Sequence, residues 1–345
     1  MPFTIRDLAK TLNLSITTVS RALDGYSDVS EKTRLRVIRA AQEMGYSPSS
    51  AARQLRRRRS DAIGYILPTS SPRFSDPFYA AFLAGLCDEA SEHQIDLIVS
   101  SSPPDSDREK AMYRRWFQSL RVDGMILNRI RSQDWRISFL AENKVPFVTL
   151  GRLPSNQDYP YILVNERGGF ERLVTHLVQK GHRRLAYVGA SPNLMIQVER
   201  FAGYKKGLEL SGLSYDGKLV VRGNLTEEGG YSAAQKLLTL PDPPTAILGC
   251  NDSTAIGILK AAQELGLQVG KDLAVAGYDG IQETAYTSPQ ITTLRQPTYE
   301  IARRLVGMLI AMINGYEPLE EPHVFFEPEL ILRASTEFGI QNLIK

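Results

Sequence analysis

Cysteine is scarce in this sequence, since only Cys87 and Cys250 occur among 345 residues. They stand far apart and have no partners at metal-ligand spacing, which argues against a disulfide framework and against a zinc site. No apolar run approaches the roughly 18 residues needed to span a bilayer. The N-terminus shows no basic-then-apolar secretion signal. We therefore expect a cytoplasmic protein of a reducing compartment that binds no metal ion.

Sequence motifs of catalysis are also lacking. No two glycines are separated by a single residue, so the dinucleotide fingerprint G-x-G-x-x-G is absent. A P-loop, a His-Glu-x-x-His and a Gly-x-Ser-x-Gly are absent too, and the four histidines are scattered along the chain. The alternation of strands and helices described below also builds dehydrogenases. Without their fingerprint we expect no catalytic residue, no cofactor and no enzymatic activity.

Charge is unevenly distributed along the chain. Residues 1–60 hold 12 Lys and Arg against 5 Asp and Glu, or +7, and the other 285 residues hold 29 against 33, or −4. The two values add to the net charge of +3. A basic segment on an acidic body predicts a part that binds a polyanion and a larger part with another task. A basic solvated tail is the alternative.

Three short helices are predicted at the start of the chain. Thr4 and Asp7 form a capping box ahead of an apolar stripe that ends at Leu12. A second helix follows a tight turn, and a third covers residues 30–45. Two short helices joined by a tight turn and supported by a third predict a helix-turn-helix domain over residues 1–46.

The second helix, residues 15–23, carries the candidate DNA-reading side chains. Ser15 caps it, and Val19, Ala22 and Leu23 face inward. The residues expected to be more exposed are Ile16, Thr17, Thr18, Ser20 and Arg21. Hydroxyl groups pair with base edges or phosphates and a guanidinium can grip guanine, so this face suits the major groove.

A hinge is predicted over residues 47–60. Pro48 suits the first turn of a helix, and short helix formers continue to Leu55. About eight residues of helix are marginal alone in water, and the four arginines at 56–59 repel each other and favour phosphates. We expect a segment that orders on DNA and frays away from it. A plain linker with an incidental leucine is the alternative.

Beyond the hinge, short apolar strands alternate with amphipathic helices, which predicts parallel sheets covered by helices. Strands are predicted at 63–67, 96–99, 124–127, 147–150, 185–188, 246–248 and 273–276, with helical patterns at 78–93 and 107–120 among them. Late crossings near 292–295 and 323–327 predict a two-lobed clamp over 61–340. We expect an N-lobe of about 61–161 plus 293–324 and a C-lobe of about 162–292 plus 325–340. Such clamps bind small ligands in the cleft by hinge closure.

Polar residues follow several predicted strands, at the sheet edge where open α/β sheets bind ligands. Arg129, Arg152, Asn251 and Asp279 are examples. A carboxylate, an amide and guanidinium groups that converge on a cleft can hydrogen-bond sugar hydroxyls as both donors and acceptors. Asp252 is interpreted instead as the N-cap of the helix that follows it.

Residues 5–9 (IRDLA), 15–23 (SITTVSRAL) and 45–48 (GYSP) closely resemble the N-terminal motif of the LacI/GalR family of transcription regulators, and the resemblance continues along nearly the whole chain. It implies a helix-turn-helix domain joined by a hinge helix to a two-lobed α/β sensor that is similar to periplasmic sugar-binding proteins. The implied major-groove residues are Thr17, Thr18 and Arg21, with Leu55 as a minor-groove wedge. The full expected DNA-binding set is Thr4, Ser15, Ile16, Thr17, Thr18, Ser20, Arg21, Ala52, Leu55 and Arg56.

The resemblance also implies where an effector binds. The family's effector-contacting positions match Arg200, Asn251 and Asp279, the cleft loop matches residues 76–79, and a crossover position matches Gln296. The full expected set is Asp76, Phe78, Tyr79, Arg129, Arg152, Arg200, Asn251, Asp279 and Gln296. This chain departs from the family pattern in having Asn165-Glu166 for a frequent Asp-Asn pair and Leu225 for a frequent aromatic platform. Either Phe78 or Tyr79 is expected to supply the stacking surface instead.

The resemblance further implies a homodimer that reads a palindromic operator as a repressor and is released by a small sugar. The segment 121–152 is similar to regulators of α-glucoside use, which leaves the ligand unnamed. No heptad tail of the kind that builds tetramers follows Thr336, so we expect a dimer. A corepressor-dependent regulator of the same family and an exported sugar-binding protein are the alternatives.

Overall fold

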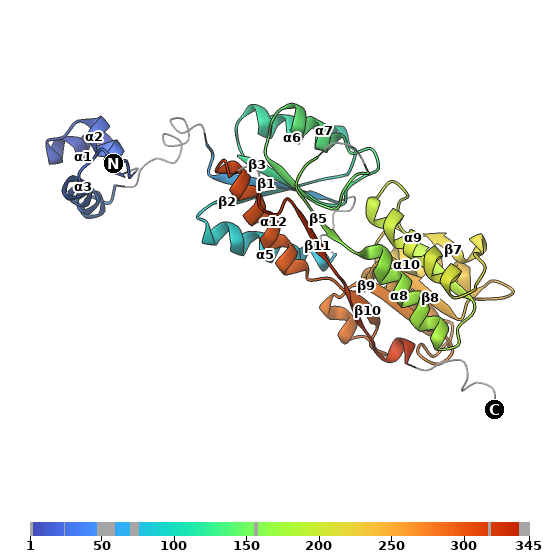
Figure 1. The fold of residues 1–345 in the computed structure, drawn as a ribbon. Coiled ribbons are helices and arrows are strands. Elements are labelled where there is room, and N and C mark those ends of the chain that lie inside the picture. The colour runs from blue at the N-terminus through green and yellow to red at the C-terminus, as the bar shows by residue number, and fades with distance from the viewer. Residues whose placement is uncertain are drawn as a thin grey trace. The chain divides into compact units, whose positions relative to one another are not determined.

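The computed structural model describes residues 3–23, 25–46, 59–69, 76–154, 158–316 and 319–337. The chain divides into two units, Met1–Ser60 and Asp61–Lys345. Figure 1 labels the helices and strands of both units.

The described residues of the first unit form three helices, α1 (Ile5–Leu12), α2 (Ile16–Leu23) and α3 (Glu31–Glu43). The predicted capping box is present at α1, because the Thr4 N–H donates to Asp7 Oδ2 at 2.9 Å and the Asp7 N–H donates to Thr4 Oγ1 at 3.4 Å. Asn13 ends α1 in the left-handed region, with φ 52°, which makes the tight turn into α2. The helix-turn-helix predicted from the sequence is confirmed.

A small apolar core joins the three helices. Its buried members are Leu8, Ala9, Leu12, Val19, Ala22, Val29, Val37, Ala40 and Ala41. Ser20 is also buried, at 9% exposure, although we expected it to be among the more exposed residues of α2. The buried arc is wider than a single stripe because α2 contacts both α1 and α3, and Ser20 lies only about 100° round the helix from Val19.

The second unit contains two six-stranded sheets. The N-lobe sheet has the order β11-β5-β4-β3-β1-β2, formed by β11 (His323–Phe326), β5 (Tyr161–Val164), β4 (Phe147–Leu150), β3 (Gly124–Leu127), β1 (Ala62–Pro68) and β2 (Asp96–Ser102). The C-lobe sheet has the order β12-β10-β9-β8-β6-β7, formed by β12 (Glu329–Ile331), β10 (Thr292–Arg295), β9 (Ala274–Asp279), β8 (Ala246–Gly249), β6 (Leu185–Gly189) and β7 (Val220–Arg222). All strand pairs are parallel except β10 with β12.

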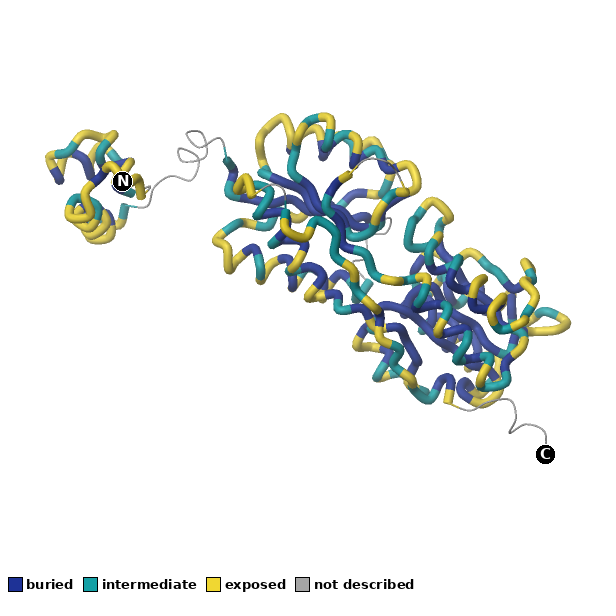
Figure 2. The backbone as a smooth tube through the Cα atoms, viewed as in Figure 1, coloured by how far each residue is buried: buried dark blue, intermediate teal, exposed yellow. Residues whose placement is uncertain are grey.

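Helices cover both faces of each sheet. In the N-lobe, α5 (Phe78–Glu92) and α12 (Thr298–Ile313) pack on one face, and α6 (Asp107–Gln118) and α7 (Trp135–Glu142) on the other. In the C-lobe, α8 (Glu166–Gln179) and α9 (Met195–Leu210) cover one face, and α10 (Glu227–Leu238) and α11 (Asp252–Glu264) the other. Three short 3-10 helices, η1 (Gly217–Leu219), η2 (Gln282–Ala285) and η3 (Ala334–Thr336), complete the C-lobe. Figure 2 shows buried strands between helices whose outer sides are exposed, as the alternating pattern predicts.

The chain crosses between the lobes three times, after β5, after β10 and after β11. These crossings lie a few residues from the expected lobe boundaries. β5 stays in the N-lobe sheet through Val164 and β11 through Phe326, whereas β10 belongs to the C-lobe sheet through Arg295. Hydrogen bonds between strands decide which lobe a residue belongs to. The apolar pattern of the sequence shows no break at the expected boundaries, so it does not show where the pairing changes. Within the described ranges no helix is long and apolar enough to span a bilayer.

Candidate functional sites

The outer face of α2 presents a small set of side chains. Ile16 is 45% exposed, and Thr17 and Arg21 are exposed as well. Ser15 and Thr18 cap the start of α2, because the Thr18 N–H donates to Ser15 Oγ at 3.0 Å and the two hydroxyl oxygens lie 2.8 Å apart. On this face Ile16, Thr17 and Arg21 are exposed and take no part in the cap, and Thr4 caps α1.

Arg21 is already held by neighbours outside α2. Its guanidinium pairs with Asp28 at 2.8 Å and lies 5.1 Å from the centre of the Tyr26 ring. Both members of the ion pair are about half exposed, with side-chain exposures of 45% and 51%. Such a pair is worth little in water, so a phosphate or a guanine can replace Asp28. Sequence reasoning missed Asp28 and Tyr26 because they lie in the loop after α2.

The remaining expected DNA contacts, Ala52, Leu55 and Arg56, lie outside the described residues. The hinge therefore stays a prediction from the sequence.

A cavity of about 650 Å³ lies between the lobes, at the carboxyl ends of the parallel strands. Its lining includes every expected effector residue except Tyr79, namely Asp76, Phe78, Arg129, Arg152, Arg200, Asn251, Asp279 and Gln296. Sequence reasoning did not select other lining residues, among them Asn128, Glu166, Met195, Glu199 and Phe325. We call this cavity the cleft.

Arg200 of α9 forms the charged centre of the C-lobe wall. Its guanidinium donates to the Cys250 carbonyl at 2.6 Å, to Glu166 Oε1 at 2.9 Å and to Asp279 Oδ1 at 3.4 Å. It lies 3.8 Å from the centre of the Tyr278 ring. Burial raises the pKa of Glu166, and the charge of Arg200 opposes that shift. Arg200 is thus a fixed cation whose position is set from several sides.

Asp279 ends β9 with φ 115°, a conformation that is uncommon for a residue with a side chain. Gln296 donates to its Oδ1 at 2.8 Å, as does Arg200, so Oδ2 is the oxygen left to accept from a ligand. Burial raises the pKa of Asp279 to about 7, against the attraction of Arg200.

Asp252 holds the turn that carries Asp279. Its Oδ2 accepts from the N–H groups of Gly280 at 2.7 Å and Ile281 at 2.9 Å, and its Oδ1 accepts from Thr293 Oγ1 at 2.6 Å. Interpreting Asp252 as the N-cap of α11 was wrong. Asn251 is that N-cap and accepts from the Thr254 N–H at 3.1 Å, because its extended backbone turns the side chain towards the first helical amides.

The N-lobe wall carries the pair Arg129 and Asp76, at 2.5 Å. Burial raises the pKa of Asp76 and Arg129 opposes the shift. Tyr79 lies behind this pair, 5% exposed, with its ring 5.0 Å from the Arg129 guanidinium. The expectation that Tyr79 could stack on a ligand is wrong. Its position three residues before Phe82 places it on the stripe of α5 that packs into the core.

The charges that line the cleft are nearly balanced. They are four arginines, Arg129, Arg152, Arg167 and Arg200, against five carboxylates, Asp76, Glu166, Glu199, Asp279 and Glu327. Arg129 pairs with Asp76, Arg167 with Glu199, and Arg200 with Glu166 and Asp279. Arg152 has no carboxylate partner among the described residues and donates to the Tyr161 hydroxyl at 3.0 Å. A site built for a phosphate would need several unpaired cations. These pairs suit a neutral ligand with many hydroxyl groups. No cluster of His, Cys, Asp or Glu in the described part of the chain can hold a metal ion.

Comparison with known proteins identifies the family of each part of the chain. Residues 4–49 match bacterial regulatory proteins of the lacI family, and residues 174–336 match a periplasmic binding protein-like domain. The HTH-type transcriptional regulator AglR of Rhizobium meliloti (strain 1021) is 36% identical over 344 residues, which cover 97% of this chain and 95% of AglR. The chain belongs to the LacI family of bacterial regulatory proteins.

Two solved structures of LacI-family regulators are similar to this chain over nearly its whole length. The Lac repressor dimer bound to operator and the anti-inducer ONPF is similar with a TM-score of 0.84 and 26% identity, covering 97% of this chain and 99% of that one. The complex of the regulator CelR with cellobiose is similar with a TM-score of 0.74 and 29% identity, covering 96% and 99%. This chain is accordingly a DNA-binding transcription regulator of the LacI family.

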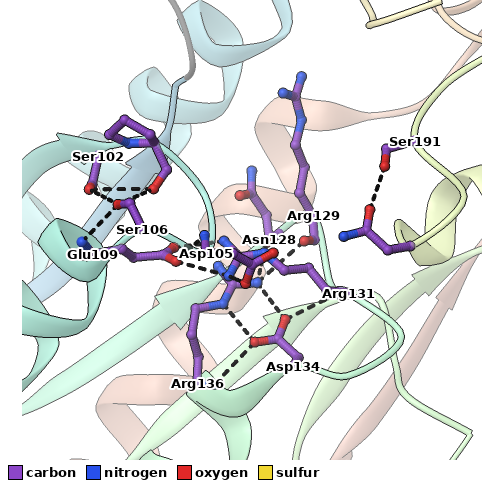
Figure 3. A network of polar contacts seen from close by, with 12 residues as sticks. Ser102, Asp105, Ser106, Glu109, Asn128, Arg129, Arg131, Asp134, Arg136 and Ser191 are labelled. Atoms are coloured by element: carbon purple, nitrogen blue, oxygen red, sulfur yellow. Dashed lines mark hydrogen bonds and ion pairs between the residues drawn. The ribbon is translucent and has the colours of Figure 1, made fainter.

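In this LacI-family regulator the loop after β3 is fixed by a buried set of ion pairs that sequence reasoning missed. We call Asp105, Glu109, Arg131, Asp134 and Arg136 the Arg131 network. Arg131, 2% exposed, donates to Asp105 at 2.8 Å and to both oxygens of Glu109 at 2.7 and 2.9 Å. Asp134 accepts from the Arg131 N–H at 3.1 Å and pairs with Arg136 at 2.6 Å. Figure 3 shows these side chains as one connected set, with the Arg129 side chain extending away from it.

The loop held by this network joins the lobes across the cleft. The Met195 N–H donates to the Ile130 carbonyl at 2.8 Å, and the Ser132 N–H donates to the Asn193 carbonyl at 2.7 Å. Arg131 and Leu194 are therefore paired as in an antiparallel ladder. We call this contact the lobe bridge. It consists of backbone groups alone, so no side-chain pattern in the sequence announces it.

Proposed function

We propose that this regulator is a homodimeric repressor that binds a palindromic operator and is released by a small neutral sugar in the cleft. The observation that carries the proposal is the cleft itself, in which Arg200, Asp279, Asp76 and Arg129 face one cavity between two lobes. These groups offer both donors and acceptors to hydroxyl groups. Because three of the four arginines that line the cleft are paired with carboxylates, the cleft favours an uncharged ligand over a phosphorylated one.

The DNA-binding half of the proposal rests on α2. Its exposed Thr17 and Arg21 suit base edges in the major groove. A single eight-residue helix reads few base pairs, so two copies related by two-fold symmetry are needed for an operator, with half-sites about 10 base pairs apart. The Lac repressor that resembles this chain is a dimer on its operator. Residues 1–46 would be the DNA-binding domain, 47–60 the hinge, and 61–340 the effector-binding domain.

We further propose that the cleft binds its ligand without converting it, and that the protein acts in the cytoplasm at the nucleoid. The buried carboxyl Asp279 accepts hydrogen bonds from Arg200 and Gln296. These partners make it a hydrogen-bond acceptor for a ligand and do not orient it as an acid or base towards a reacting bond. CelR, which resembles this chain, is known in complex with cellobiose.

Two measurements on the full-length protein test the proposal. Selection from random DNA should yield a palindrome, and gel shifts on that site should weaken when the correct sugar is added. Thermal unfolding against mono- and disaccharides, phosphosugars and purines should show stabilisation by one sugar. At 100 times Kd this stabilisation is about 2.7 kcal/mol.

The possible results separate the candidate functions. A ligand that strengthens operator binding would replace the inducer by a corepressor. Stabilisation by a phosphosugar or a purine alone would overturn the assignment of a neutral sugar. A chain that selects no DNA sequence at all would contradict the role assigned to α2.

A further inference from the structure

We infer that Phe325 is a stacking platform that gives the cleft an outer subsite, so that the effector is a saccharide of two rings. The inference rests on the proposed sugar effector and specifies its size. Phe325 lies on β11, lines the cleft and is 68% exposed.

The position of Phe325 on β11 shows that the exposure is not a general property of that strand. Side chains alternate between the faces of a strand, and the neighbours Val324 and Phe326 pack against the core between the sheet, α5 and α12. Phe325 points to the opposite face, at an edge of the sheet. Exposing so large an apolar ring to water is unfavourable. A ligand that covers it would recover that free energy.

Phe325 is also held in place, as a stacking surface must be. Its ring meets Tyr161 edge-on with centres 6.2 Å apart. Tyr161 stacks on His323 at 4.2 Å and accepts a hydrogen bond from Arg152 at 3.0 Å. His323 in turn lies 3.0 Å from Asp158. A ring fixed in this way loses little conformational entropy when a ligand covers it.

The rest of the cleft wall offers no equivalent ring on the C-lobe side. The aromatic residues of the lining are Phe78, Phe325 and Phe326, all from the N-lobe. On the C-lobe wall Leu225 is aliphatic and only 7% exposed. Phe78 and Phe326 are partly buried against the N-lobe core, which leaves Phe325 as the large open ring among the described lining residues.

Two chemically different regions therefore share one cavity. The inner region contains Arg200, Asp279, Asn251 and Gln296 and binds hydroxyl groups. The outer region contains Phe325 and binds the C–H face of a sugar ring by apolar and aromatic contact. A volume of about 650 Å³ lies within the range of roughly 300–1,000 Å³ that encloses drug-sized ligands, which leaves room for a second ring beside the first.

The test compares Phe325→Ala with Phe325→Trp in the full-length protein. Calorimetric titration with maltose, cellobiose, sucrose, trehalose and glucose gives Kd for each. Phe325→Ala should raise the Kd of the disaccharide that binds about tenfold and change the Kd of glucose by less than about twofold. Phe325→Trp should leave the Kd of the disaccharide unchanged. Tyr286→Ala is the matched control, because Tyr286 is 80% exposed and does not line the cleft. Operator binding and thermal unfolding should be unchanged in the Tyr286→Ala control, and operator binding without ligand reports whether the two Phe325 variants are folded.

Other results would overturn the inference in distinguishable ways. Equal losses for glucose and the disaccharide, or no loss, would remove Phe325 from an outer subsite. A wild-type protein that binds glucose but none of the disaccharides would leave the sugar effector standing and refute the second ring. A wild-type protein that binds no saccharide would refute the proposed effector class and the subsite with it, before any variant is compared.

Discussion

The backbone N–H of Met195 in the C-lobe donates to the carbonyl of Ile130 in the N-lobe at 2.8 Å, and so ties the two walls of the cleft together. Hydrogen bonds of this kind are worth about 0.5–1.5 kcal/mol each. Two of them form the lobe bridge, which favours the arrangement of the lobes in this structure. We expect the effector to bind to this arrangement.

Met195→Pro should weaken effector binding by about fivefold. Met195 is the first residue of α9 and follows Leu194 in an extended conformation, so proline fits the helix start and removes the donor of the bridge. Calorimetric titration with the effector measures the change. Met195→Ala is the control, because it keeps the N–H and, like proline, removes most of the side chain that lines the cleft. If the proline and alanine variants bind the effector equally well, the bridge does not contribute to effector binding.

Glu109→Gln should destabilise the N-lobe by about 3–5 kcal/mol, because the buried charge of Arg131 loses the buried carboxylate that balances it. Urea unfolding measures the loss. The double change Glu109→Leu with Arg131→Met should recover much of it, since well-packed apolar residues often replace a buried ion pair at little cost. Glu321→Gln breaks the exposed pair with Arg304 and should change stability by less than about 1 kcal/mol. A loss in Glu109→Gln no greater than in Glu321→Gln would contradict this account of the Arg131 network.

Much of the fold could be predicted because burial repeats with the period of each element. The strands at 63–67 and 246–248 read as unbroken apolar runs, and both prove to be buried on both faces. The capping box at Thr4 and the cap at Ser30 fixed two helix starts in the DNA-binding unit. These signals are local in sequence, so no tertiary information was needed.

The site could be predicted only in part, because its decisive features depend on which elements meet. Tyr79 and Phe78 are adjacent in sequence, yet only Phe78 reaches the cleft, since the orientation of α5 decides which of them faces the core. Asp252 looks like a helix cap until β10 brings Thr293 beside it. Phe325 is exposed because β11 is an edge strand of its sheet. The sequence around it is apolar and does not show that the strand lies at an edge.

Effector binding should strengthen as the pH rises through about 7. Burial raises the pKa of Asp279 to about 7, and the charged carboxylate accepts hydrogen bonds from sugar hydroxyls more strongly than the protonated form. Kd measured from pH 6 to pH 8 should therefore fall for the wild type and stay flat for Asp279→Asn.

The ligand-free protein should respond in the opposite direction. Between pH 3.8 and about 7 the folded Asp279 holds a proton that the unfolded side chain has lost. Its contribution to stability therefore falls as the pH rises across that window. Denaturant titrations should therefore show that the unfolding free energy of the wild type falls, relative to that of Asp279→Asn, as the pH rises across that window. A pH-independent difference would contradict a raised pKa.

His182 should make the C-lobe acid-sensitive. It is 2% exposed and contacts Thr245 Oγ1 through Nδ1 at 3.1 Å. Burial, with the nearby His176 and Arg183, lowers the pKa of His182 from 6.5 to about 4. The unfolded imidazole takes up its proton first as pH falls, so stability present above pH 6.5 is lost between pH 6.5 and 4, by up to about 3 kcal/mol.

The measurement for His182 is the unfolding free energy of wild type and His182→Asn at pH 7 and pH 4.5. The wild type should lose more than the variant, which cannot take up that proton. His93, with a side chain 47% exposed, provides the control His93→Asn for the change of a histidine to asparagine as such. Parallel curves for wild type and His182→Asn would show that protonation of this imidazole does not oppose folding.

Arg21→Ala should lower affinity for the operator by about 1–3 kcal/mol, or roughly 5- to 150-fold, and change affinity for random DNA much less. The exposed ion pair with Asp28 and the contact with Tyr26 hold the guanidinium at the outer face of α2, where base edges can replace the carboxylate. Gel shifts on operator and on random DNA at one salt concentration give both affinities. Asp28→Asn separates the two roles of Arg21, because it frees the guanidinium and removes a negative charge, and should raise both affinities by less than about 1 kcal/mol. If Arg21→Ala weakens operator and random DNA equally, Arg21 contacts phosphate, and the sequence is read by Ile16 and Thr17 instead.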